Sequence, residues 1–242
     1  MLAVLFVETR KLHRSLAVLL AVAAPGLIAV FTFFNLMRGK TPQAWEMWMA
    51  GATGIWAFFM LPMSVTALTA LVAHMEHGPR SWDHLRSLPL PRWRLYAAKA
   101  VVVLAMVAVM SAATLLLTGA AVMLASAMRP DLAPTGPLAI GGWAGAMGKV
   151  FLASILMVAI QLWTALRFAS FVPALVLGIG GTFFSVVATA ARPGVFLPWQ
   201  MPVNMLIASE PWRAATALGL GCGLGLVATA LAVAHLARRE VL

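Results

Sequence analysis

Six long apolar stretches run through this chain of 242 residues and constrain its fold more than any other feature. Short charged or proline-rich segments separate them. At a rise of about 1.5 Å per residue, a helix of about 20 residues crosses a hydrocarbon core of roughly 30 Å. We therefore predict an all-α, polytopic membrane protein with six transmembrane helices. The stretches are Ser15 to Phe34, Gly51 to Ala73, Ala100 to Ala125, Trp143 to Leu166, Phe168 to Ala190 and Ala214 to Leu236.

The composition excludes a soluble protein of this size. Hydrophobic residues make up 62% of the chain and charged residues only 10%, which leaves too little polar surface to cover a globule. The segments between the apolar stretches are too short to bury a core of their own, so we predict a single membrane domain over residues 1–242. The net charge of +10 does not indicate a nucleic-acid partner, because the cations lie at helix ends, where they meet lipid headgroups.

The distribution of Lys and Arg predicts the orientation. If both termini are cytoplasmic, 11 of the 17 Lys and Arg residues lie on the cytoplasmic side, as the positive-inside rule favours. An even number of spans is required for this arrangement, and six satisfies it.

Residues 1–15 are predicted to form an interfacial amphipathic helix that is retained rather than cleaved as a signal. Apolar residues such as Leu5 and Leu12 recur at helical spacing, which suits a helix lying in the headgroup layer. A frayed basic tail is the alternative. The charged residues elsewhere around this helix are Glu8, Arg10, Lys11 and Arg14.

Residues 74–96 form the longest and most polar connection and are predicted to be a cytoplasmic loop. They hold two acids and three histidines, and a metal site built from His74, His77 and His84 is one alternative. A solvated connection without a partner is another. Against that, Trp82 and Leu85 alternate with the charges, which favours a docking segment.

The chain shows no chemistry of its own. No Asp, Glu, Lys, Arg or His lies near the centre of a predicted span, so the sites expected of ion-driven carriers are missing. The pair Gly148-Lys149 imitates part of a P-loop, but Trp143 and Val150 occupy the positions of its first glycine and its hydroxyl. We predict no catalytic, cofactor-binding or metal-binding residues.

Two further features concern packing. Residues 191–213 are unusually apolar for a loop, and we expect them to pack on the outer face of the bundle. The sixth span carries two small-xxx-small pairs on roughly opposite faces, so helices are expected to approach it closely. These helix-packing residues are Gly219, Gly221, Gly223 and Gly225.

Three segments together resemble ABC-2-type permeases. They are Glu8 to Ser15 (ETRKLHRS), the region Glu76 to Lys99, and the step Ser170 to Pro173 followed by Gly178, Gly180 and Gly181. The chain is most similar to the subgroup that serves lantibiotic immunity and bacitracin-type resistance. The resemblance covers nearly the whole chain in order.

The resemblance implies that residues 1–15 lie at the inner interface and that Glu76 to Leu88 contains a coupling helix inserted into a separate ABC ATPase. Two ATPase subunits and two permeases would assemble, the second permease being the same or a different chain. ATP and Mg²⁺ would bind in the ATPase, and this chain would hold no cofactor. The expected ATPase-coupling residues are Glu76, His77, Arg80, Trp82, Asp83, His84, Leu85 and Arg86.

The function implied is that of a permease subunit of an ATP-driven exporter in the bacterial cytoplasmic (inner) membrane. Its substrate would be hydrophobic or amphipathic, for example an antimicrobial peptide, with membrane lipid as a further partner. Two alternatives stay open at this point: a membrane-embedded metal-dependent enzyme, and a passive scaffold or channel subunit.

Overall fold

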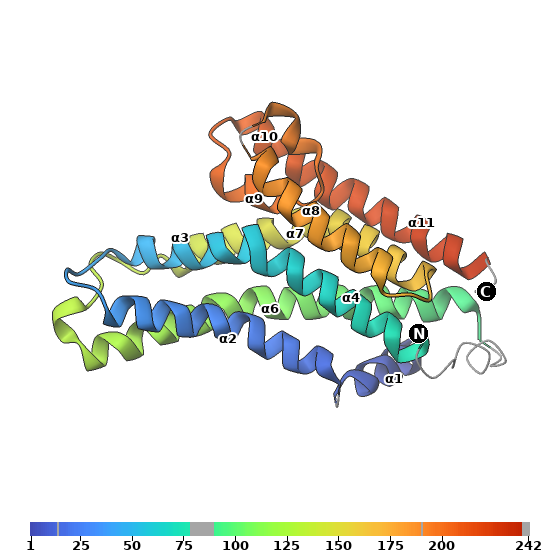
Figure 1. The fold of residues 1–242 in the computed structure, drawn as a ribbon, viewed down its shortest axis with the longest axis horizontal. Helices are drawn as coiled ribbons and strands as arrows, with labels where there is room; N and C mark the ends of the chain where they lie inside the picture. Colours follow the sequence, from blue (N-terminus) through green and yellow to red (C-terminus); the bar gives the residue numbers. More distant parts are fainter. Residues whose placement is uncertain (14, 78–89, 190, 239–242) are drawn as a thin grey trace.

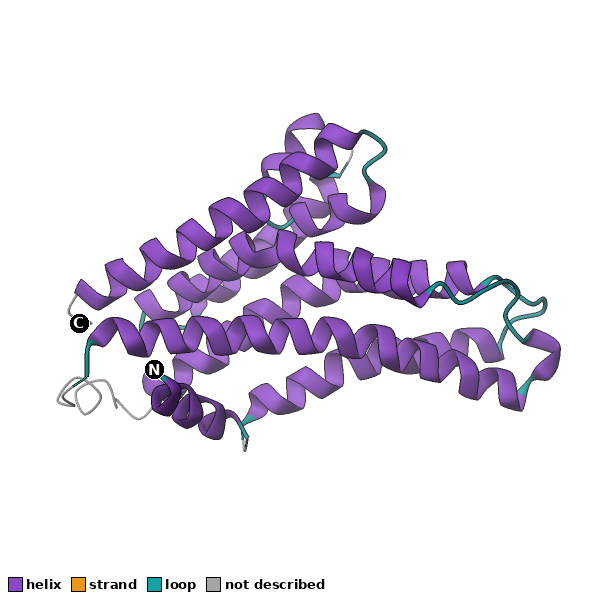
Figure 2. Cartoon of the chain, turned by 180° about the vertical axis from the view of Figure 1, so that it is seen from behind, coloured by secondary structure: helices purple, strands orange, loops and turns teal. Residues whose placement is uncertain are grey.

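The computed structural model describes residues 1–13, 15–77, 90–189 and 191–238. Within these ranges the chain is helical and contains no strand, as Figure 2 shows, so the predicted all-α class is confirmed. The helices are α1 (Leu2–Leu12), α2 (Leu16–Met37), α3 (Trp45–Ile55), α4 (Leu61–His77), α6 (Arg92–Met128), α7 (Ile140–Arg167), α8 (Val172–Ala188), α9 (Met201–Ile207), α10 (Pro211–Leu218) and α11 (Gly225–Arg238).

Two π-helical turns make longer continuous helices out of shorter ones. The turn η1 (Trp56–Met60) joins α3 to α4, and η4 (Gly219–Leu224) joins α10 to α11. The results are continuous helices of 33 residues, Trp45–His77, and 28 residues, Pro211–Arg238.

Five helices of the described chain are long and apolar enough to cross a membrane, so the chain is a multi-pass membrane protein. These five are α2, the helix Trp45–His77, α6, α7 and the helix Pro211–Arg238. Five of the six predicted spans fall on them. The prediction of six is not confirmed, because the remaining stretch forms α8, which has only 17 residues. Its shortness follows from its start: Pro173 lies in the first turn, where a residue without an N–H is favoured.

The helices form an elongated bundle in which α1 and the end of α11 lie at the same end (Figure 1). The helix α2 packs along α6, and α11 packs along α7. Large side chains such as Trp56, Leu68 and Met157 are fully buried between the helices. The indole of Trp56 donates a hydrogen bond to Ser111 Oγ at 3.2 Å, so this buried polar group is satisfied.

The segment between α8 and α10 is packed rather than extended. It consists of η3 (Arg192–Phe196) and α9, and α9 lies against α7. The side chains of Val195, Trp199 and Met201 are buried. A Cβ atom at Gly181 of α8 would lie 2.5 Å from Cε2 of Trp199, so only glycine allows the indole to lie this close to α8.

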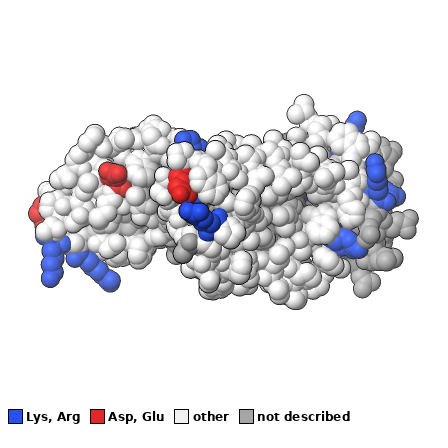
Figure 3. Space-filling view, turned by 90° about the horizontal axis from the view of Figure 1, so that it is seen from above, with Lys and Arg blue, Asp and Glu red and all other residues white. Residues whose placement is uncertain are grey.

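Charged side chains are distributed unevenly over the molecule. On the face seen in Figure 3, a stretch without Lys, Arg, Asp or Glu separates the cations at one end from the charged side chains towards the other. Large apolar side chains such as Leu116, Val187 and Leu231 are exposed instead. In a membrane protein, such surfaces meet lipid.

Candidate functional site

Four charged side chains from three helices form a closed ring of ion pairs, which we call the ionic ring: Glu8, Lys11, Glu76 and Lys99. Lys11 Nζ lies 2.8 Å from Glu8 Oε1 and 2.8 Å from Glu76 Oε1. Lys99 Nζ lies 2.7 Å from Glu8 Oε2 and 2.7 Å from Glu76 Oε1. Each ammonium group therefore donates hydrogen bonds to both carboxylates.

Helix geometry brings these side chains together. Glu8 and Lys11 lie one turn apart on α1, with the acid on the N-terminal side, which is the favourable order. Glu76 lies in the last turn of α4, and Lys99 lies near the start of α6. The ionic ring thus ties α1 to the two helices that residues 78–91 connect along the chain.

Burial makes the ring strong only as a complete set. Glu8, Glu76 and Lys99 are 5%, 2% and 1% exposed. An isolated charge at such a site would be very unfavourable, but here two cations neutralise two carboxylates. Burial alone would lower the pKa of Lys11, yet its pKa is raised, because hydrogen bonds to Glu76 and Glu8 favour the charged ammonium.

The predicted interface-helix residues divide between two environments. Glu8 and Lys11 belong to the ionic ring, whereas Arg10 is exposed and Arg14 lies outside the described residues. The buried face of α1 is Val4, Glu8 and Leu12. Glu8 therefore faces the protein, where Lys99 gives it a buried partner.

The predicted ATPase-coupling residues lie mostly outside the described part of the chain. These are Arg80, Trp82, Asp83, His84, Leu85 and Arg86. Of the other two, Glu76 belongs to the ionic ring and His77 ends α4. The burial of Glu76 against Lys11 and Lys99 favours a role within its own chain. A contact between these residues and an ATPase stays a prediction.

Lys99 was not among the predicted site residues. It lies 91 residues from Glu8 and 23 from Glu76 in sequence, so local spacing gives no hint of either pair. The available signal was chemical. Lys99 stands at the start of an apolar stretch, where a buried lysine requires an acidic partner. The chain has only seven Asp and Glu residues, so few partners are available.

The histidines do not form a metal centre within the described residues. His74 and His77 both lie in α4, and His84 lies outside the described part. Among the residues that the structure describes, no group of three or more His, Cys, Asp or Glu side chains could hold a metal ion.

The four glycines of the sixth span are not equivalent. A Cβ atom at Gly221 would overlap the carbonyl oxygen of Ala153, and one at Gly225 would lie 2.6 Å from the backbone nitrogen of Leu156. Gly219 and Gly223 have no such neighbour within 4 Å in this chain. One glycine face therefore packs on α7, and the other is exposed.

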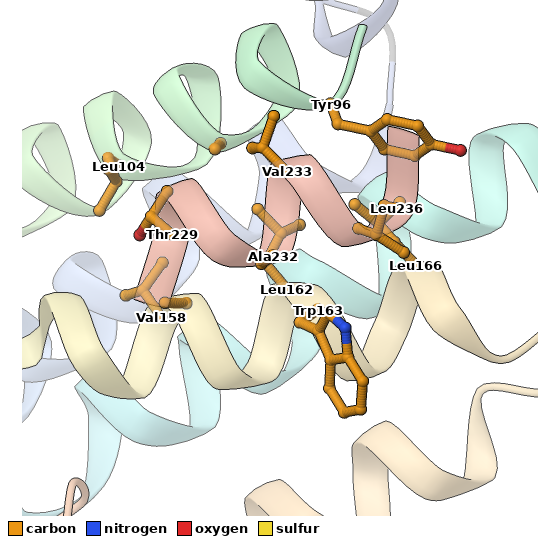
Figure 4. A pocket seen from close by; sticks show the side chains of 12 residues that line it. Tyr96, Leu104, Val158, Leu162, Trp163, Leu166, Thr229, Ala232, Val233 and Leu236 are labelled. Carbon is orange, nitrogen blue, oxygen red and sulfur yellow. The ribbon is translucent and has the colours of Figure 1, made fainter. Parts of the chain in front are cut away.

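A narrow cavity lies between α6, α7 and α11 (Figure 4). Its lining is apolar and includes Leu104, Val158 and Val233. With a volume of about 10 Å³ it is no larger than one water molecule requires, so it is a packing gap rather than a substrate site.

The comparisons with known proteins give one match. A family model described as ABC-2 family transporter protein matches residues 4–185, a range that includes the whole ionic ring. A search of curated proteins and a search of solved structures found no match to the chain.

Proposed function

Because the chain belongs to the ABC-2 family of transporter proteins, a membrane transport component that is not itself catalytic, we propose that it is the permease subunit of an ATP-driven exporter. A separate ABC ATPase subunit would bind ATP and Mg²⁺ and supply the energy. The predicted spans carry no ionisable residue near their centres, which agrees with an energy source in a separate subunit.

The ionic ring is the structural observation that best supports this proposal. Residues 78–91 connect α4 to α6. An ATPase that binds this connection and changes conformation would displace the ends of both helices. The ionic ring fixes α1 to those ends through hydrogen bonds of 2.7 to 2.8 Å. Displacement of the connection would therefore move α1, α4 and α6 as one body, as alternating access requires.

The proposed topology has six spans, with both termini in the cytoplasm of a bacterial cell. The 17 residues of α8 reach about 26 Å, a little less than the hydrocarbon core, and such a mismatch is accommodated by local thinning of the bilayer. The position of α1 and of the end of α11 at one end of the bundle supports an even number of spans (Figure 1). Reporter fusions after Arg94 should report cytoplasm, and fusions after Lys40 or Trp199 the outer side. An outward signal after Arg94 would contradict the topology.

The proposed assembly contains two ATPase subunits and two permeases, with a second permease that is a copy or a different chain. The substrate would be hydrophobic or amphipathic, as the uncharged apolar surfaces favour. Resistance to an antimicrobial peptide, as in lantibiotic immunity, is the specific role that we propose from the resemblance of the sequence.

Two kinds of variant separate ATPase binding from coupling. Trp82→Ala and Leu85→Ala remove apolar anchors and should weaken ATPase association by about 1 to 3 kcal/mol. The double variant Glu8→Gln with Lys99→Met removes one acid and one base, so the ionic ring keeps its neutrality and retains the Lys11–Glu76 pair. It should retain association but lose most transport-linked ATP turnover.

The measurements are co-purification of the ATPase and substrate-stimulated ATP turnover in liposomes. Glu46→Gln is the matched control, because this acid is exposed and lies far from the ionic ring in sequence. If no ATPase co-purifies with the wild-type chain, the permease proposal is wrong. If the double variant turns over ATP like the control, the coupling role of the ionic ring is wrong.

A further inference from the structure

The contact between α7 and α11 changes character along its length. At Gly221 of η4 and at Gly225, where α11 begins, the helix Pro211–Arg238 touches α7 backbone to backbone. Further along the two helices, Trp163 Nε1 of α7 donates a hydrogen bond to His235 Nδ1 of α11, at 3.0 Å. Between these two points, the glycine contact limits the helix pair at one end and the Trp163–His235 hydrogen bond limits it at the other.

An open groove of about 450 Å³ occupies that stretch on the outer surface of the two helices. Its walls are small or apolar, with Ala159 and Ile160 from α7 and Ala228 and Leu231 from α11. The indole of Trp163 leaves α7 on the side away from Tyr96 and Val233, as Figure 4 shows. It therefore contributes to this outer groove as well as to the narrow cavity of the interior.

Two arginines lie one helical turn beyond the polar end of the groove. His235 is followed one turn later on α11 by the exposed Arg238, and Trp163 is followed one turn later on α7 by Arg167. Residues three or four apart lie on the same helix face. Neither residues 140–167 nor residues 211–238 contain an Asp or Glu that would neutralise these groups.

We infer that this groove binds one acyl chain of an anionic phospholipid, whose headgroup lies at His235, Arg238 and Arg167. An apolar channel that ends in positive charge is complementary to an anionic amphiphile, and the membrane supplies that molecule at this depth. The indole of Trp163 suits the boundary, because its ring is apolar and its N–H needs a polar partner. A lipid in this groove would brace α7 against α11 beside the Trp163–His235 hydrogen bond.

The test uses the full chain in nanodiscs of phosphatidylcholine that contain a minor fraction of phosphatidylglycerol with a photoreactive group on one acyl chain. Cross-links should map to the peptides that carry Ile160 and Leu231. Unlabelled phosphatidylglycerol should compete for them at least about fivefold better than phosphatidylcholine, because each of the two arginines is expected to contribute about this factor. This competition uses the wild-type protein and does not depend on the folding of a variant.

Variants then locate the site. Ala228→Leu fills the groove and should reduce the cross-links several-fold, whereas Ala230→Leu, at an exposed position outside the groove, should not. Arg238→Gln should reduce the preference for phosphatidylglycerol about fivefold while the acyl-chain cross-links remain. Equal competition by phosphatidylcholine would mean ordinary contact with bulk lipid and would overturn the inference. Cross-linking of the groove to a second copy of the chain would overturn it too.

Discussion

The ionic ring and the η3–α9 segment are both buried, but opposite kinds of interaction hold them. In the ionic ring each carboxylate accepts hydrogen bonds from two ammonium groups. In the segment, Trp199 Nε1 and the side-chain oxygens of Gln200 and Asn204 have no hydrogen-bond partner among the described protein atoms. Charge determines the position of the first, and shape determines the position of the second.

The difference indicates which perturbation each region tolerates. A ring of buried charges is sensitive to the loss of any single charge but tolerates the loss of a neutral pair. A region held by shape, where Trp199 lies on Gly181, is sensitive to added volume instead. The same holds outside this segment where Gly221 of η4 lies on Ala153 of α7. Charge variants and volume variants should therefore act on different parts of the molecule.

The largest effect is expected from Lys99→Met. It leaves Glu8 and Glu76 buried with Lys11 alone, and breaking a buried ion pair in this way typically costs about 3 to 5 kcal/mol. The double variant Glu8→Gln with Lys99→Met should recover much of that loss, because the remaining pair is neutral. Thermal unfolding in one detergent checks both variants, with Lys149→Met as the exposed control. A single variant as stable as the control would show that the ionic ring is not held by charge.

The next largest effect is expected from Gly221→Ala. The added methyl group would overlap the carbonyl oxygen of Ala153, which cannot rotate away, so we expect a loss of about 1 to 3 kcal/mol. Gly223→Ala is the matched control, since it adds the same methyl group where nothing lies within 4 Å. Equal unfolding temperatures for the two variants would contradict packing by shape along the continuous helix Pro211–Arg238.

Hydropathy was sufficient to locate five long helices, because the cost of unpaired backbone groups in lipid leaves few other structures for long apolar stretches. It did not predict that α8 is short. The sequence did not separate the glycine faces either, since Gly219 and Gly221 are equivalent until a neighbouring helix is in place. The pairs of the ionic ring were not predicted: Glu8 and Lys11 lie one turn apart on α1, but the link of Glu8 to Lys99 depends on tertiary packing.

A smaller effect concerns alkaline pH at the ionic ring. The pKa of Lys11 is raised above its ordinary value of 10.5, so its stabilising contribution is complete below that value and is lost as pH rises through the higher folded pKa. Unfolding temperatures measured above pH 10.5 should fall more steeply for the wild type than for Lys11→Met. Lys40→Met, which removes an exposed lysine, should keep the steep wild-type dependence. Parallel curves for wild type and Lys11→Met would refute this contribution.

The smallest effect is expected from the exposed ion pair between Arg129 and Asp131, which is as short as the buried pairs of the ionic ring. Arg129 Nη2 lies 2.7 Å from Asp131 Oδ2, as close as the pairs of the ionic ring, but these side chains are 39% and 61% exposed. The hydrogen bond from Arg129 lowers the pKa of Asp131, so the pair contributes at neutral pH and loses its contribution as the carboxylate is protonated in acid. Solvent screens such a pair, and we expect Asp131→Asn to leave the unfolding temperature unchanged within error. A loss comparable to that of Lys99→Met would show that distance, rather than burial, determines the strength of the ion pairs in this protein.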